Sequence, residues 1–198
     1  MAATRGRQVE EPKLSREAIL DEAALLFKRN GYRKTRLEEL AQVLGVTRPA
    51  IYYHFKAKQD LLVAMYMRSM EALNGIAAGS EEDEGLPPVE QFWRRIEAHA
   101  IYIASYPVEA GIFFEEEEEL PEDVHAEVRR MLVAYTDRLV SFYSAAQKAG
   151  DAPEGDPRVA VSAILGGAIW TYRWYPGSDW DDPRAAAREV VRVLRSAS

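Results

Sequence analysis

The segment from Leu37 to Lys58, LEELAQVLGVTRPAIYYHFKAK, constrains the fold more than any other part of the chain. Apolar residues recur there every three or four positions, which predicts a short helix with one buried face. Gly45 ends that helix, because glycine readily adopts the left-handed conformation of a sharp turn. Thr47 can cap a second helix, and Pro49 is tolerated in a first turn whose amides have no helical acceptor. The segment therefore predicts a helix-turn-helix.

The first of these helices is expected to begin near Arg36, because Thr35 and Glu38 have the spacing of a capping box. The second is expected to run from about Arg48 to Tyr53, following a turn in which Val46 is buried. Exposed side chains on such a helix can reach DNA phosphates and base edges. The candidate DNA-binding residues are Thr35, Arg36, Thr47, Arg48, Pro49, Ala50, Tyr52, Tyr53, His54 and Lys58.

The run GVTRPAIYYHFKAKQDLL resembles the signature of TetR-family transcriptional regulators. A glycine turn, a capped recognition helix, a Tyr-His-Phe triplet and a lysine opening the next helix follow in the family's order, and residues 14–32 resemble its first helix. Arg36 departs from the pattern, because the family usually has Thr or Ser there. The resemblance implies a DNA-binding domain over residues 13–58, followed by a helical ligand-binding and dimerisation domain over residues 59–198.

Basic charge is concentrated at the N-terminal end. Residues 1–58 contain 12 Lys and Arg against 7 Asp and Glu, a net charge of +5. The other 140 residues contain 13 against 25, a net charge of −12, which accounts for the total of −7. A basic segment gains DNA affinity by releasing counterions, so binding should weaken as salt rises. The acidic remainder argues against a nonspecific nucleic-acid coat or a membrane-surface protein.

Residues 1–12 form a polar N-terminal arm that contains Arg5 and Arg7 and has no apolar periodicity. We expect this arm to be disordered in isolation. Two interpretations stay open for it: an arm that enters the DNA minor groove, or an untethered terminus.

Several classes of protein are disfavoured by what the sequence lacks. It has no cysteine, no long apolar run and no signal peptide, which predicts a cytoplasmic protein without disulfides or membrane contact. It also lacks a glycine-rich phosphate loop, a zinc-binding His-Glu spacing and a nucleophile elbow. We therefore expect no enzyme, no catalytic residues, no metal site and no cofactor.

Beyond Lys58 the apolar spacing predicts helices almost throughout, with prolines and glycines at their ends. The sequence thus predicts an all-α chain of about nine helices, with no strand. After the DNA-binding domain, the first expected helix runs through Leu61 and Leu73. The others are Val89–Tyr106, Val108–Leu120, Pro121–Lys148, Pro157–Tyr175 and Pro183–Ala197, with a loop over Gly79–Pro88.

The last two helices are apolar over more surface than one chain is expected to cover. Two such helices from each of two subunits would form a four-helix interface with two-fold symmetry, as in TetR-like dimers. The alternative is that they close the core of a single chain. The candidate interface residues are Ile164, Leu165, Gly167, Ala168, Val190 and Leu194.

Aromatic residues in the second domain suggest an apolar ligand pocket between helices. The alternative is that these residues simply pack in the core. The segment WTYRWYPG, residues 170–177, is similar to the eighth helix of TetR-like repressors of fatty-acid, sterol or aromatic-acid catabolism that respond to acyl-CoA thioesters. An aromatic wall beside a guanidinium would suit an acyl group and coenzyme A phosphates; the same residues could instead anchor the dimer interface. The candidate ligand-binding residues are Trp93, His99, Ile103, Phe113, Phe114, Tyr135, Trp170, Arg173 and Trp174.

The sequence therefore predicts a homodimeric repressor that binds a palindromic operator and is released by a small effector, an acyl-CoA thioester. Five successive glutamates, Glu115 to Glu119, are expected to cover all sides of a helix and to face mostly water. An inward carboxylate among them would support the alternative, a repressor of an efflux gene that responds to cationic drugs. A structural DNA-binding protein without a ligand is the more remote alternative.

Overall fold

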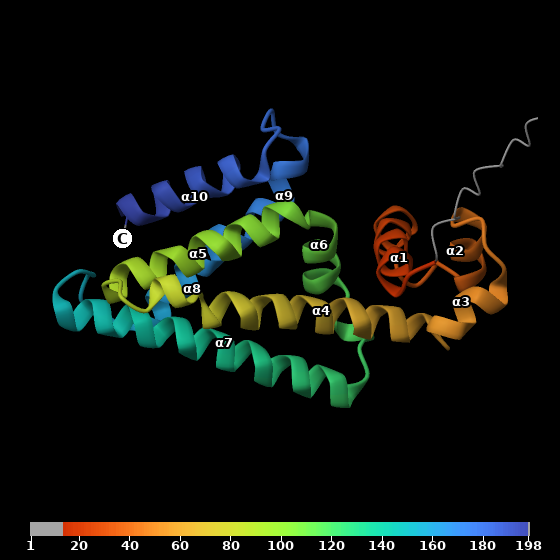
Figure 1. Ribbon diagram of the computed structural model, residues 1–198, viewed down its shortest axis with the longest axis horizontal. Helices are drawn as coiled ribbons and strands as arrows, with labels where there is room; N and C mark the ends of the chain where they lie inside the picture. Colours follow the sequence, from red (N-terminus) through yellow and green to blue (C-terminus); the bar gives the residue numbers. More distant parts are fainter. Residues whose placement is uncertain (1–13, 198) are drawn as a thin grey trace, which may run out of the picture. The chain divides into compact units, whose positions relative to one another are not determined.

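The computed structural model describes residues 14–197, apart from the side chain of Ala197 (Figure 1). This part of the chain contains ten α-helices, three short 3-10 helices and no strand, which confirms the predicted all-α fold. The helix beyond the expected number is the four-residue segment Thr171–Trp174, which follows a break in one expected helix. The predicted N-terminal arm lies outside the described residues. The chain divides into two compact units, Met1–Lys58 and Gln59–Ser198.

The first unit contains three helices, α1 (Arg16–Asn30), α2 (Leu37–Val43) and α3 (Arg48–His54). The Ser15 hydroxyl caps α1 by accepting from the Ala18 amide at 3.0 Å. Each helix contributes an apolar stripe to one small core, because residues three and four positions apart share a helix face. The largest fully buried side chains of this core are Ile19, Leu26, Leu40, Ile51 and Phe55.

The second unit begins within α4 (Lys58–Ala78) and continues through α5 (Pro88–Ser105), α6 (Pro107–Glu115), α7 (Glu122–Ala149), α8 (Pro157–Ile169), α9 (Thr171–Trp174) and α10 (Pro183–Ala197). Helix α5 packs against α7, α8 and α10, and Figure 1 shows α10 lying alongside it. The 3-10 helices are Glu81–Asp83, Glu117–Glu119 and Tyr175–Gly177. Helix α5 is therefore central to this unit.

The ends of several helices follow the predicted capping chemistry. The Asp156 carboxylate accepts from the Arg158 amide at 2.8 Å at the start of α8, and the Asp182 carboxylate accepts from the Arg184 amide at 2.9 Å at the start of α10. Gly150 ends α7 in the left-handed conformation, with φ of 81°. These side chains and the backbone freedom of glycine satisfy helix ends that would otherwise lack partners.

The glutamate run differs from its prediction. Helix α6 ends at Glu115, and Glu117–Glu119 form a 3-10 helix rather than a continuation of the α-helix. The five carboxylates therefore do not surround one helix. Repulsion between neighbouring like charges disfavours the longer helix, because carboxylates three and four positions apart would face each other.

Candidate functional site

The helix-turn-helix forms as the sequence predicts. Gly45 has φ of 66°, and the Val46 amide donates to the Ala41 carbonyl at 3.0 Å, which closes the turn. Val46 is half-buried rather than fully buried. Ile51 and Phe55 anchor α3 in the core. The opposite side of α3 is exposed and carries Arg48, Pro49, Tyr52 and Tyr53, of which Tyr53 is 78% exposed.

The predicted capping role of Thr35 is wrong. Its side chain is 4% exposed, and its hydroxyl donates to the Gly31 carbonyl at 3.0 Å and lies 3.4 Å from the Leu26 carbonyl. Arg36 is the residue that precedes α2, and no side chain caps that helix. A threonine hydroxyl can bond either a nearby carbonyl or the amides of the next helix, and here it bonds the carbonyls. Thr35 is consequently enclosed, which also contradicts its assignment as a DNA contact.

The remaining candidate DNA contacts lie at or near the surface of the first unit. Arg36 and Thr47 are exposed, Ala50 and His54 are half-buried, and the Thr47 hydroxyl makes no capping bond. Lys58 has a structural role that sequence reasoning missed, because its ammonium donates to the carbonyls of Tyr32 at 2.6 Å and Arg33 at 3.0 Å. A DNA contact by Lys58 stays a prediction.

Helices α4 to α8 of the second unit enclose a cavity of about 120 Å³. Five of the nine predicted ligand residues line it: His99, Ile103, Phe113, Phe114 and Tyr135. The lining residues that the prediction did not include are Ser69, Leu73, Tyr102, Ala110, Leu132, Thr136, Leu165 and Ile169. Among the described residues, no Asp, Glu, Lys or Arg lines the cavity, so the polar side-chain groups of this lining are hydroxyls and one imidazole.

Two polar pairs cross this cavity lining. His99 Nδ1 lies 2.7 Å from the Tyr135 hydroxyl oxygen, and the two rings stack with centroids 5.7 Å apart. The Tyr102 hydroxyl donates to Ser69 Oγ at 3.2 Å. Burial lowers the pKa of His99 to about 4 and raises the pKa values of Tyr102 and Tyr135, so all of these groups are neutral near pH 7.

Side chains of α4 hold α6 and the residues after it. The Tyr66 hydroxyl donates to the Phe113 carbonyl at 2.7 Å and to the Ile112 carbonyl at 3.2 Å, and the Tyr66 ring stacks on Phe113 with centroids 4.6 Å apart. Arg68 pairs with Glu109 at 2.8 Å. Phe113 is thus both a wall of the cavity and a direct contact of α4.

Models of known protein families match the N-terminal and the C-terminal parts of the chain. The model described as "Bacterial regulatory proteins, tetR family" matches residues 19–65, which include the helix-turn-helix. The model described as "Tetracyclin repressor-like, C-terminal domain" matches residues 85–197, more than half of the chain. This protein belongs to the TetR family. The family is one of transcriptional regulators and not of enzymes.

Solved TetR-family structures share the fold over most of the chain. PfmR of Thermus thermophilus is 27% identical, with a TM-score of 0.78 over 90% of this chain and 97% of PfmR. AibR, solved with isovaleryl coenzyme A and operator DNA, is 24% identical, with a TM-score of 0.73 over 90% of this chain and 96% of AibR. At that identity the likeness to AibR shows the fold alone.

Curated TetR-family relatives match over a shorter stretch. The probable regulator ArpR of Pseudomonas putida is 35% identical over 83 residues, which are 42% of this chain and 40% of ArpR. This match therefore spans about two fifths of that relative.

Four predicted ligand residues of this TetR-family protein do not line the cavity. Trp93 is buried against Phe92, whereas Trp170 is 60% exposed and Trp174 is exposed. Arg173 forms an exposed ion pair with Glu115 at 2.9 Å. Helix α8 ends at Ile169, so the residues after this break do not continue the inward stripe of α8.

The predicted interface residues are mostly enclosed by their own chain. Ile164, Leu165 and Ala168 are buried, and Leu165 lines the cavity. Gly167 lets α8 approach α10, because a Cβ atom there would lie 2.7 Å from Leu194 Cδ2. Val190 is half-buried. The apolar face of α8 that stays exposed carries Val159, Ala163 and Gly166; Trp170, which directly follows α8, and Val193 on α10 are exposed as well.

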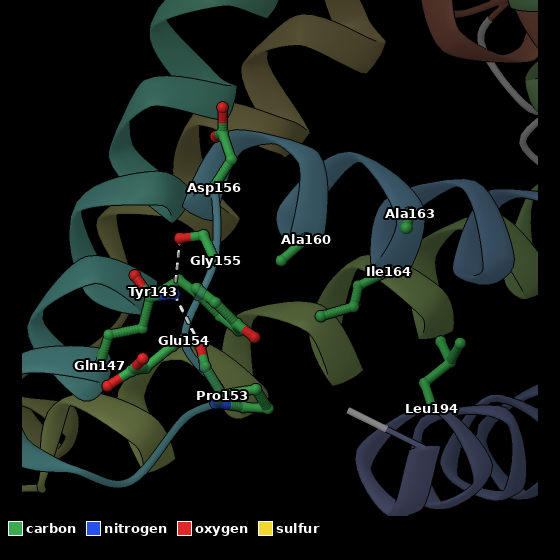
Figure 2. Close-up of a pocket in the computed structure, with 10 residues that line it drawn as sticks. All are labelled: Tyr143, Gln147, Pro153, Glu154, Gly155, Asp156, Ala160, Ala163, Ile164 and Leu194. Carbon is green, nitrogen blue, oxygen red and sulfur yellow. Dashed lines mark hydrogen bonds between the residues drawn. The ribbon is translucent and has the colours of Figure 1, made fainter.

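A groove of about 360 Å³ lies beside this exposed face (Figure 2). Ala160, Ala163 and Ile164 of α8 and Leu194 of α10 form its apolar side. Gln147 of α7 forms the other side and donates to the carbonyls of Pro153 at 2.7 Å and Gly155 at 3.2 Å.

Among the described residues, no group of three or more His, Cys, Asp or Glu side chains is placed to hold a metal ion. No helix in that part of the chain is long and apolar enough to cross a membrane.

Proposed function

We propose that this TetR-family protein is a homodimeric, one-component transcriptional repressor that an effector in the α4–α8 cavity releases from its operator. The observation that carries the proposal is the double role of Phe113, which lines the cavity and stacks on Tyr66 of α4. Helix α4 begins at Lys58, the last residue of the unit that holds the helix-turn-helix. A molecule that displaces Phe113 therefore acts on the helix that leads to the DNA-binding unit.

The proposed DNA-binding surface is the exposed side of α3. Arg48, Tyr52 and Tyr53 project from it, Thr47 directly precedes it, and Arg36, which precedes α2, is also exposed. A helix of this kind enters the major groove with its N-terminal residues toward the bases, while flanking cations contact phosphates. Dimerisation supplies a second recognition helix for a palindromic operator.

The proposed dimer surface comprises the exposed apolar residues of α8, Val159, Ala163 and Gly166, together with Trp170 directly after α8 and Val193 of α10. Small residues at Ala163 and Gly166 permit close helix approach, and Trp170 offers a large apolar side chain that water covers in a single chain. This face replaces the set predicted from the sequence, most of which is buried within one chain.

The proposed effector is an acyl-CoA thioester whose acyl group enters the cavity. The uncharged lining favours an acyl group over the nucleotide phosphates, which would remain outside. AibR, which was solved with isovaleryl coenzyme A, shares the fold and supports the class only weakly. The lining gives no support to a cationic drug, because it contains no carboxylate.

Fluorescence anisotropy of labelled DNA from the protein's own upstream region tests this proposal. Protein and DNA are titrated with a panel of acyl-CoA thioesters and, separately, with the matching free acids. We expect one class of thioester to release the DNA while its free acid does not. Tight DNA binding that no thioester weakens would contradict the effector assignment, and the absence of specific DNA binding would contradict the repressor itself.

A further inference from the structure

One buried nitrogen in the cavity lining lacks a hydrogen-bond partner in the described part of the chain. His99 is 2% exposed, and its Nδ1 is engaged by the Tyr135 hydroxyl at 2.7 Å. Its Nε2 has no partner among the described residues. Leaving a buried polar atom unpaired is unfavourable, and most such atoms in proteins are satisfied. A molecule in this cavity gains affinity by bonding His99 Nε2.

The pairing with Tyr135 indicates which hydrogen-bonding role Nε2 plays. A neutral imidazole carries one N–H, and a tyrosine carries one O–H. If Nδ1 carries the hydrogen and donates to Tyr135, both the tyrosine O–H and Nε2 lack partners. If Tyr135 donates to Nδ1, only the Nε2–H group is left. The second arrangement leaves fewer buried groups unpaired, so we assign Nε2 as a donor.

The cavity also selects against charge. No Asp, Glu, Lys or Arg lines it, and burial lowers the pKa of His99 to about 4, so the imidazole is neutral near pH 7. A carboxylate or an ammonium group would lose its hydration without meeting an opposite charge, which is strongly unfavourable. An uncharged oxygen has no such penalty.

We propose that the enclosed part of the effector is uncharged and mainly apolar, and that it carries a carbonyl or hydroxyl oxygen that accepts a hydrogen bond from His99 Nε2. Tyr135 is a positioning residue, because it fixes the imidazole through Nδ1. The proposal rests on the proposed function only in treating the bound molecule as the effector. It predicts that a thioester binds in preference to its free acid, since the thioester carbonyl is neutral.

Small ring compounds probe this chemistry directly. An apolar cavity of roughly 150 Å³ binds benzene, so a cavity of about 120 Å³ admits at most a single small ring. Cyclohexanone presents a carbonyl oxygen, methylenecyclohexane has the same shape without the acceptor, and cyclohexanecarboxylate adds a charge. Their dissociation constants are measured by ligand-observed NMR titration of the full-length protein.

The matched variant is the double substitution His99→Phe with Tyr135→Phe, which removes both polar partners while keeping two buried rings. Replacing both partners is much less damaging than leaving one unpaired. In the wild type we expect cyclohexanone to bind about tenfold more tightly than methylenecyclohexane, and the carboxylate to bind least. In the double variant the two neutral probes should bind equally.

Equal binding of the neutral probes by the wild type, an unchanged preference in the double variant, or tightest binding of the carboxylate would each overturn the inference. So would failure of both neutral probes to bind. Thioester-induced release of operator DNA from the wild type is measured in parallel to separate this inference from the repressor proposal. If the wild type shows no preference for cyclohexanone while a thioester still releases the operator, only the cavity chemistry is overturned. If the preference is present but no thioester releases the operator, only the repressor proposal is overturned.

Discussion

At the scale of single residues, burial changes the chemistry of His99 most. An exposed histidine titrates near pH 6.5, whereas the enclosed His99 has a pKa of about 4. Burial likewise decides the role of Thr35, whose hydroxyl bonds the Gly31 carbonyl instead of capping α2. From the sequence, Thr35 was predicted to cap a helix and His99 to contact a ligand. The sequence could not show which partner each would meet.

The depressed pKa of His99 makes stability depend on pH. Below pH 6.5 the unfolded chain binds a proton at this residue and the folded chain does not, so the free energy of unfolding falls as pH falls toward 4. Between pH 7 and pH 5 we expect His99 to contribute a loss of about 2 kcal/mol. Urea unfolding of the wild type and of the His99→Phe, Tyr135→Phe double variant measures the difference. Parallel pH profiles for the two proteins would contradict the buried neutral state.

Arg48 and Tyr53 are the residues whose loss should affect the operator most directly. Arg48→Ala should weaken operator binding by about 1–3 kcal/mol if the side chain reads a base, and Tyr53→Ala should also weaken it. Arg129→Ala is the matched control, because it removes the same charge from an exposed position on α7. Anisotropy gives the affinities and sedimentation confirms the dimer. Wild-type affinity in Arg48→Ala would remove α3 from the proposed interface.

At the scale of elements, α4 is held at its C-terminal end by a buried guanidinium. Arg95 donates to the carbonyls of Ala77 and Ala78 at 3.0 Å, and its guanidinium lies 4.1 Å from the ring centre of Phe142. Gly79 follows with φ of 75°, and a Cβ atom there would collide with Arg95. The C-terminal end of α4 is therefore held in place. Under the proposed function, a displacement near Phe113 would move the rest of α4 relative to this held end.

Substitutions at two glycines test this fixed end. Gly79→Ala should lower the free energy of unfolding by about 2 kcal/mol or more, since it combines left-handed strain with a clash. Gly75→Ala is the control: it lies within α4 with open space around its Cβ position and should be neutral or stabilising by up to about 1 kcal/mol. Thermal or urea unfolding compares the two. Equal stability of the two variants would contradict the packing of Arg95 on Gly79.

Tyr66→Phe tests the link between α4 and α6. The change keeps the ring stacked on Phe113 but removes the bonds to the Ile112 and Phe113 carbonyls, at a cost in stability of about 1 kcal/mol. We expect operator affinity to be retained and effector-induced release to be reduced. Tyr143→Phe, another buried tyrosine, is the control. Full release by Tyr66→Phe would show that these bonds do not transmit the signal.

At the scale of the whole molecule, the sequence predicts where helices form better than it predicts which surface each helix packs against. Gly45 and Pro49 are local signals, and the turn they predict is present. Periodicity identified the apolar stripe of α8, but a stripe packed against its own chain and one packed against a partner have the same pattern. Ile164 and Ala168 therefore proved to be buried within one chain. The residues at the break after α8, Ile169, Trp170 and Thr171, include no glycine or proline, so the sequence did not predict the break.

Coupling between the cavity and the operator must be reciprocal, so it can be measured from the side of the ligand. The dissociation constant of the releasing thioester is measured by titration calorimetry with and without saturating operator DNA. Linkage requires the operator to weaken thioester binding by the same factor by which the thioester weakens operator binding, a factor of about 5–150 in typical cases. The account predicts these equal factors. Thioester affinity that operator DNA leaves unchanged would contradict it.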